Sequence, residues 1–428
     1  MLSRSLPESN KAESTGAGSN GQSSALANPL VMRIAVCTVL LAVLGILITT
    51  DATVGTARYG TIAAKQLALL PLAAAAFALG YWVRPKGWKT LATAMMALGL
   101  ILLGVVLFPG LAHTSRGASR WINLGGFTFH PMEYFKFAFI IFSAHMLSSI
   151  KANALTPSQG LSRLLLVFFL GAGLIALEPD VDAIIILVFM LVGMSLASGA
   201  FSFKTLMKLA LAGIVVMGLF VVAAMNLRGT SWGSALSKDK YDVEQAKYAI
   251  ASGGLAKLAP GSSVQKYYIP EPHNDFAFAI LAEELGAVGA GLLILLYLGL
   301  VFAGLEISRR FHDQTFESTL AMGISLIVGA QVFLNMGVAT GLIPVAGLPL
   351  PLVSYGFTAM FMNMFEFGIL ARLAHETVRM PVRRPQAVVA SITTPRAASP
   401  PPPPLVTPAG TRASFFSSLP PRGPNRRG

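Results

Sequence analysis

The sequence predicts an all-α polytopic membrane protein with about ten transmembrane helices. Its 428 residues have a mean hydropathy of +0.65, and only 12% of them are charged. Uninterrupted apolar runs of roughly 18–22 residues recur along the chain, and a helix of that length crosses a hydrocarbon core about 30 Å thick. A closed barrel also spans a bilayer, but its alternation of apolar and polar residues is absent.

Ten apolar segments are expected to span the membrane, with short connections except for one large external loop before the eighth. The eighth segment is about 31 residues long, so Gly286, Gly289 and Gly291 predict a bend or a strong tilt in it. The expected spans are 31–50, 64–83, 90–109, 131–149, 162–177, 181–199, 205–226, 276–306, 318–341 and 352–373.

Polar residues dominate both ends of the chain. Residues 1–29 are rich in Ser, Asn and Gly and are expected to form a disordered cytoplasmic tail. Residues 377–428 are rich in proline and arginine and are expected to form a second, extended tail. Between them, residues 30–376 form the transmembrane domain with its large loop at 227–275. The single cysteine, Cys37, lies in the first span, which excludes an intrachain disulfide.

Basic residues mark one side of the membrane. They recur in alternate connections, and such a bias identifies the cytoplasmic side. Both termini are therefore expected in the cytoplasm and the large loop outside. The net charge of +13 is dispersed along membrane edges and the tail, so it does not predict a nucleic-acid partner. These basic residues are Arg84, Lys86, Lys89, Lys151, Arg163, Lys204, Lys208, Arg309, Arg310 and Arg372.

Two external loops carry cations against this rule. The loop at 110–130 contains Arg116 and Arg120, and the large loop contains six further Arg and Lys residues. These cations are either part of a solvated ectodomain or an anion site for phosphate. Within the large loop, residues 241–250 are expected to form a short amphipathic helix that ends at Gly253.

Charged residues also lie inside or beside the predicted spans. Glu133 and Lys136 are three apart, so they share a helix face that should turn away from lipid. They form either a self-neutralising ion pair or a charged pair in a cavity. Glu283 and Glu284 need polar partners, for which Gln331 or Asn335 on the ninth span is expected.

The junction of the fifth and sixth spans carries three carboxylates, Glu178, Asp180 and Asp182. They are either helix caps or ligands of a divalent cation. The segment 270–276, Pro-Glu-Pro-His-Asn-Asp-Phe, joins the large loop to the eighth span. Ionisable groups at such a position are expensive, so Asp275 is a functional candidate, although it or Asn274 could instead cap the helix.

Several motifs in order resemble the SEDS family (shape, elongation, division and sporulation) over about residues 31–375. The resemblance is closer to the member that acts in division than to the one that acts in elongation. The motifs are Ser-Arg-Trp-Ile-Asn-Leu-Gly at 119–125 with Pro131, Glu133 and Lys136; Glu-Pro-Asp at 178–180; the 270–276 segment with 283–286; and the C-terminal segments 341–344, 347–351 and 354–356.

The resemblance implies a peptidoglycan glycosyltransferase with ten transmembrane helices. It implies that lipid II is polymerised outside the cytoplasmic membrane, at the division septum. The implied partners are a single-pass class B penicillin-binding protein and other division proteins.

The chemistry fits the charged candidates. A sugar hydroxyl must attack an anomeric carbon while a polyprenyl pyrophosphate leaves, which requires a base and a cation. We expect Asp275 to be the base and Lys136, with Arg120 second, to stabilise the pyrophosphate. Glu133 would hold Lys136 or help to bind a divalent cation, Mg²⁺ or Mn²⁺. Expected substrate contacts are Arg116, Arg120, Trp121, Glu271, His273 and Ser354.

The motifs also depart from the family pattern at His130, Met132, Asp182, Phe357 and Thr358. Two other classes of function therefore stay open. One is a flippase that moves lipid II across the bilayer, because a bundle with buried charges would serve a transporter equally. The other is a scaffold of the division machinery with weakened catalysis.

Overall fold

The structure is a computed structural model, and its described residues all belong to the unit Met1–Met380. The expected tails lie almost wholly outside these residues, as do Arg116 and Glu271, which were predicted to contact substrate. The structure describes residues 28–54, 59–108, 112–115, 118–123, 128–178, 180–227, 232–270, 272–311, 316–343 and 347–378.

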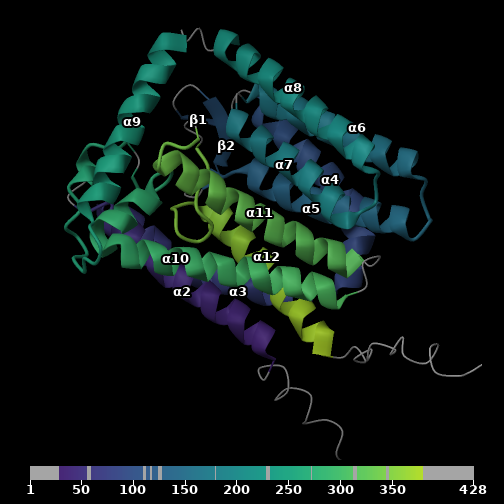
Figure 1. Cartoon of the computed structure of the whole chain (residues 1–428), viewed down its shortest axis with the longest axis horizontal. Helices are drawn as coiled ribbons and strands as arrows, with labels where there is room; N and C mark the ends of the chain where they lie inside the picture. The colour runs from purple at the N-terminus through teal and green to yellow at the C-terminus, as the bar shows by residue number, and fades with distance from the viewer. Residues whose placement is uncertain are drawn as a thin grey trace, which may run out of the picture. The chain divides into compact units, whose positions relative to one another are not determined.

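The described part of the chain contains ten helices that coincide with the ten expected spans, and one more helix, α9, in the large loop (Figure 1). The predicted helical membrane fold is confirmed. The helices are α2 (Pro29–Asp51), α3 (Tyr59–Trp82), α4 (Pro85–Val106), α5 (Pro131–Lys151), α6 (Pro157–Leu177), α7 (Val181–Ser198), α8 (Phe203–Leu227), α9 (Trp232–Ser252), α10 (Ala277–Arg310), α11 (Phe316–Ala339) and α12 (Phe357–Val378).

Seven of the described helices are long and apolar enough to cross a membrane by themselves: α2, α3, α4, α6, α10, α11 and α12. The helix α7 contributes a shorter apolar run. The helix α5 is not among these seven, and it carries the charged residues Glu133 and Lys136. It packs against α4, α6, α7, α11 and α12. Its charged side chains are thereby kept away from lipid, as a polar intramembrane helix requires.

Prolines and polar caps set several helix starts. α4 and α6 each begin with a proline, five residues before the expected span. Pro85 fits the first turn, where no backbone N–H is needed. At the start of α6, the N-cap residue Thr156 and Gln159 in the first turn form a reciprocal capping box. In contrast, α12 starts five residues later than expected, because a turn at 351–353 with Leu352 at φ +66° precedes it.

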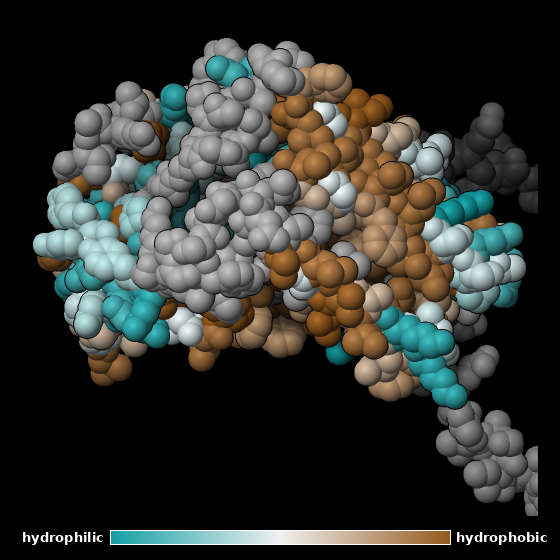
Figure 2. Space-filling view, turned by 90° about the horizontal axis from the view of Figure 1, so that it is seen from above, coloured by the Kyte–Doolittle hydropathy of each residue, from teal (hydrophilic) through white to brown (hydrophobic). Residues whose placement is uncertain are grey.

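On the face seen in Figure 2, described residues form a broad apolar band with hydrophilic residues at either end. Exposed large apolar side chains line the outward faces of α2, α3, α4, α6, α8 and α10. Lipid tails can cover such a band without any loss of hydrogen bonds, because the helices satisfy their own backbone groups.

A small antiparallel sheet occupies part of the 110–130 segment, for which only a loop was expected. Its strands are β1 (Ala112–Ser115), β2 (Ala118–Asn123) and β3 (Thr128–Phe129), in the order β1-β2-β3. Short strands within a loop give weak periodicity, so the sequence pattern did not reveal them. The sheet brings Arg120 and Trp121 beside the start of α5.

A sharp bend divides α10 at Gly286, whose φ is 68° and ψ is −170°. The bend frees backbone groups, and the large loop satisfies them. Ala287 N donates to Gly254 O at 3.0 Å, and Val288 N donates to Leu255 O at 3.1 Å. The predicted bend is confirmed, and the loop after α9 is fixed to it by main-chain hydrogen bonds.

Replacement of Gly286 by alanine should destabilise the protein. Its backbone lies in a region that is essentially restricted to glycine, so a Cβ costs about 1–3 kcal/mol. That Cβ would also lie 3.0 Å from Gly253 O. We expect a lower melting temperature for Gly286→Ala in detergent. Gly291→Ala on the same helix is the control, because nothing lies within 4 Å of its Cβ, and equal melting temperatures would contradict the prediction.

Candidate functional site

The segment that carries Asp275 is held by hydrogen bonds to three successive carbonyl groups. Tyr355 N donates to His273 O at 2.9 Å, and Ser354 Oγ donates to Asn274 O at 2.5 Å. The amide of Asn335 on α11 donates to Asp275 O at 2.9 Å. The backbone of the predicted base is therefore fixed by α11 and by the loop before α12, while its side chain is partly exposed.

The N-cap position of α10 is not occupied by Asp275 or Asn274. The N-cap residue of α10 is Phe276, whose side chain makes no cap hydrogen bond. The alternative in which Asp275 or Asn274 caps the span is therefore wrong. The structure places Ser354 against the segment that carries Asp275 and pairs the His273 ring with that of Tyr355. Ser354 Oγ also accepts a hydrogen bond from Leu350 N at 2.9 Å. Ser354 thus anchors two backbone segments.

A second carboxylate lies beside Asp275. Asp182, in the first turn of α7, accepts a hydrogen bond from Gly347 N at 2.6 Å. A Cβ built on Gly347 would lie 3.2 Å from Asp182 Oδ2 and 3.6 Å from Asp275 Oδ2. The two carboxylates therefore flank one glycine at the external mouth of the bundle.

Glu133 and Lys136 form a buried ion pair, with Lys136 Nζ 2.8 Å from Glu133 Oε1. The expected shared face is confirmed, and the Lys136 side chain is only 5% exposed. Sequence reasoning missed Glu366 of α12. This residue is buried and close enough to Glu133 and Lys136 for their charges to interact with it. A single carboxylate inside an apolar span was the signal that could have identified it.

Arg120 belongs to a separate cluster at the start of α7. Its guanidinium lies 3.7 Å from Asp180 Oδ1, and its Nε donates to Glu178 O at 3.3 Å. The rings of Trp121 and His130 lie 5.7 Å apart, and His130 Nε2 lies 3.9 Å from Asp180 Oδ2. Asp180 occupies the N-cap position of α7 without a side-chain cap bond, so it is an ion-pair partner and not the expected cap.

Burial governs the protonation of this Arg120 cluster. It raises the pKa of Glu178 to about 8, and Asp180 raises this pKa further while Arg120 lowers it. Burial also lowers the pKa of His130, although Asp180 opposes that shift. Among the described residues, no group of three or more His, Cys, Asp or Glu side chains is placed to hold a metal ion. The residues present therefore do not by themselves fit the expected divalent cation.

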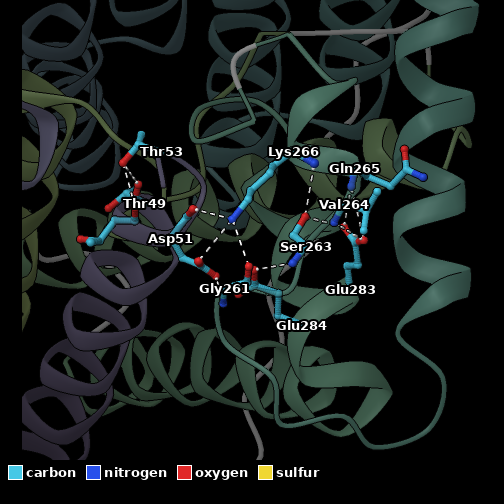
Figure 3. Close-up of polar contacts among 11 residues, drawn as sticks. Thr49, Asp51, Thr53, Gly261, Ser263, Val264, Gln265, Lys266, Glu283 and Glu284 are labelled. Carbon is cyan, nitrogen blue, oxygen red and sulfur yellow. Dashed lines mark hydrogen bonds and ion pairs between the residues drawn. The ribbon is translucent and has the colours of Figure 1, made fainter. Parts of the chain in front are cut away.

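A buried polar cluster fixes the large loop to α2 and α10 (Figure 3). Lys266 Nζ lies 3.5 Å from Asp51 Oδ1 and donates to Gly261 O at 3.3 Å, and its side chain is 1% exposed. Gly261 N donates to Asp51 Oδ2 at 2.7 Å. Lys266 was expected in a solvated ectodomain or a phosphate site, and both expectations are wrong for this residue.

Glu283 and Glu284 belong to the same cluster. Glu283 accepts hydrogen bonds from Ser263 Oγ at 2.6 Å and Val264 N at 2.9 Å, and Glu284 accepts one from Ser263 N at 3.2 Å. The expected partners Gln331 and Asn335 are therefore wrong. Because residues 261–266 are fixed in this way, the 270–276 segment starts from a defined position.

Comparisons with known proteins agree with this architecture. The family model described as cell cycle protein, for FtsW, RodA and SpoVE, matches residues 30–379. The probable peptidoglycan glycosyltransferase FtsW of Coxiella burnetii is 33% identical over 304 residues, 68% of this chain and 80% of that protein. Stage V sporulation protein E of Bacillus subtilis is 33% identical over 300 residues, 69% of this chain and 80% of that protein.

Two solved structures share the fold. The crystal structure of the rod shape determining protein RodA of Thermus thermophilus has a TM-score of 0.61 at 22% identity, covering 81% of this chain and 97% of that one. A chain from a study of structural coordination of polymerization and crosslinking by a peptidoglycan synthase complex has a TM-score of 0.62 at 23% identity, covering 82% and 98%.

Loss of Lys266 should release the loop that leads to Asp275. Lys266→Met leaves the buried Asp51 carboxylate without its cation, and breaking one partner of a buried pair costs about 3–5 kcal/mol. We expect a large drop in the unfolding free energy, with a smaller drop when Asp51→Asn is added, because the unpaired charge is then removed.

Chemical denaturation in detergent, arranged as a double-mutant cycle, measures this coupling. The control is Lys240→Met, which disrupts the exposed Lys240–Glu244 pair on α9 and should cost about 0–1 kcal/mol. Strict additivity of the Lys266→Met and Asp51→Asn effects would contradict the buried interaction.

Proposed function

The chain belongs to the cell cycle protein family of FtsW, RodA and SpoVE, and on that premise we propose that it is a peptidoglycan glycosyltransferase that polymerises lipid II. The observation that carries this proposal is Asp275. It is a partly exposed carboxylate at the external end of α10, on a backbone held at three successive carbonyls. Relatives named as probable peptidoglycan glycosyltransferases support the same activity.

The reaction joins two lipid-linked disaccharides. The acceptor hydroxyl oxygen forms a bond to the donor anomeric carbon, and the bond from that carbon to the pyrophosphate oxygen breaks. The pyrophosphate takes the electron pair, and Asp275 takes the hydroxyl proton as general base. Attack opposite the leaving group inverts the anomeric centre, as in inverting glycosidases.

Arg120 is proposed to stabilise the pyrophosphate, and Lys136 to set the charge inside the bundle. The Arg120 side chain is 21% exposed, so it can contact a phosphate while it remains beside Asp180. Lys136 is buried and paired with Glu133. Its proposed role is to supply a positive charge inside the bundle, without direct contact with the pyrophosphate. Trp121 and His273 lie near the mouth as further proposed substrate contacts.

A divalent cation, Mg²⁺ or Mn²⁺, stays a proposal. When bound, it would neutralise developing phosphate charge. Because the described residues do not gather three ligands, no step of the reaction is assigned to it.

The partner is proposed to be a single-pass class B penicillin-binding protein at the division septum. Support comes from α10, where an apolar stripe faces outward over about four turns. A helix–helix contact in lipid needs such a face, with small residues that allow close approach, and Gly291 has open space beside it. The stripe consists of Val288, Leu292, Leu295 and Phe302, which are 61%, 50%, 65% and 56% exposed.

Asp275→Asn should abolish glycan synthesis. The amide keeps the side-chain volume but cannot accept the hydroxyl proton, and losing a positioned base costs on the order of 10²–10⁴ in rate. The measurement is polymerisation of labelled lipid II by purified protein with its partner, resolved by glycan length. Glu244→Gln on α9, which removes an exposed carboxylate, is the matched control.

The same experiment separates the polymerase from a flippase. A flippase would make no glycan in wild-type form, and its Asp275→Asn variant would be impaired in exposing lipid II at the outer leaflet. Near-normal polymerisation by folded Asp275→Asn protein would remove Asp275 from the base role.

The partner helix should be captured from α10. Photo-crosslinking residues at positions 292 and 295 lie on the apolar stripe, so we expect them to trap the partner's transmembrane segment. Position 219 on α8 is equally apolar and 68% exposed, so it controls for random collision in the membrane. Capture from position 219 but not from 292 or 295 would reject this docking face.

A further inference from the structure

Asp182 lies close to Asp275, and the proposed mechanism does not use it. It stands in the first turn of α7 and reaches across 165 positions of sequence to accept the hydrogen bond from Gly347 N. A Cβ on the same glycine would lie 3.2 Å from Asp182 Oδ2 and 3.6 Å from Asp275 Oδ2, so these two oxygens lie within about 7 Å of each other. Both side chains are partly exposed at the mouth.

The Gly347 contact also connects Asp182 to the backbone that carries Asp275. Asn335 Nδ2 donates both to Leu348 O at 2.7 Å and to Asp275 O at 2.9 Å. Gly347 and Leu348 are consecutive residues. Asp182 therefore binds the main chain at Gly347, and Asn335 joins the next residue, Leu348, to Asp275. The distance between the two carboxylates is thus set by fixed main chain.

We propose that Asp182 is a positioning residue that sets the basicity of Asp275, an inference that rests on the glycosyltransferase function proposed above. A negative charge close by disfavours a second negative charge, so it raises the pKa of the neighbouring carboxyl. A carboxylate whose pKa is moved toward the working pH is a stronger base for a sugar hydroxyl. Asp182 acts through Asp275 and through Gly347, without touching the substrate.

The size of the effect follows from Coulomb's law. At about 7 Å, two unit charges interact by an amount equivalent to about half a pH unit in a water-like medium and about two units in a protein-like medium. Activity needs ionised Asp275, so it falls as pH drops through the pKa of that carboxyl. Removing the Asp182 charge lowers this pKa, and the acid limb of the pH–rate profile moves to lower pH.

Other titratable groups around Asp275 determine how the profile is measured. Burial raises the pKa of Tyr355, which therefore titrates far above the acid limb. Glu178, with a pKa of about 8, can add a second transition, so the profiles are also recorded in a Glu178→Gln background. Among the described residues, the titratable and charged groups on the elements around the mouth are Asp182 of α7, Asp180 at its N-cap, Arg120 of β2, His130 before α5, His273 of the 272–276 segment, Tyr355 of the loop before α12, and Lys247 of α9 beside Gly341.

Three substitutions at Asp182 separate charge from hydrogen bonding. Asp182→Asn keeps an oxygen that can accept from Gly347 N but removes the charge, so its acid limb should move down by about half to two pH units. Asp182→Glu keeps the charge on a longer side chain, so its limb should stay near that of the wild type. Asp182→Ala removes charge and hydrogen bond, so its limb should move down and its maximal rate should also fall.

The profiles are measured between about pH 3.5 and 8, because an ordinary aspartate titrates near pH 3.9, with purified protein, its partner and labelled lipid II, and melting temperatures confirm folding. Glu244→Gln is the control for loss of an external carboxylate and should leave the limb in place. An acid limb that does not move in folded Asp182→Asn overturns the inference, as does an equal shift in Asp182→Glu. If wild-type protein makes no glycan at any pH, the proposed function has failed, and the inference fails with it.

Discussion

Polar groups inside a bilayer must find their partners within the protein, and this constraint shapes the external mouth of the bundle. The bend at Gly286 frees backbone N–H groups of α10, and carbonyls of residues 254 and 255 accept their hydrogen bonds. The loop then needs its own partners, which are Asp51 and the glutamates of α10. The segment 270–276 inherits its position from these contacts, so the proposed catalytic carboxylate depends on a bend eleven residues away in sequence.

The carboxylates of the bundle and of its external mouth differ in their hydrogen bonds, ion pairs and exposure. Glu283 is bonded to loop N–H and hydroxyl groups, and a carboxylate with several donors serves to hold structure. Glu133 is neutralised by Lys136 inside the bundle. Asp275 and Asp182 differ because both are partly exposed and share one glycine. Among these described carboxylates, Asp275 combines a backbone held at three carbonyl groups with a partly exposed side chain.

Three of the five departures from the family motifs, His130, Asp182 and Thr358, make contacts between elements. His130 N donates to Thr358 Oγ1 at 2.9 Å, and this hydroxyl donates to Thr128 O at 3.2 Å, which joins the starts of α5 and α12. Asp182 joins α7 to the loop before α12. Two of the changed positions thus contact each other, and a third reaches Asp275 through Gly347. Changes at contacting positions can compensate, because their effects on packing are not independent.

The sequence by itself determined the helical membrane fold, the Glu133–Lys136 pair and a bend in the eighth span, and it made Asp275 a candidate, because run length, helical spacing and intramembrane charge are local signals. It misassigned the partners of Glu283 and Glu284 and missed the β-strands, Glu366 and the pairing of Lys266 with Asp51. These contacts join residues as many as 215 positions apart. Only tertiary packing decides which distant polar group is buried against which, since every buried carboxylate needs a partner but its sequence neighbours do not specify one.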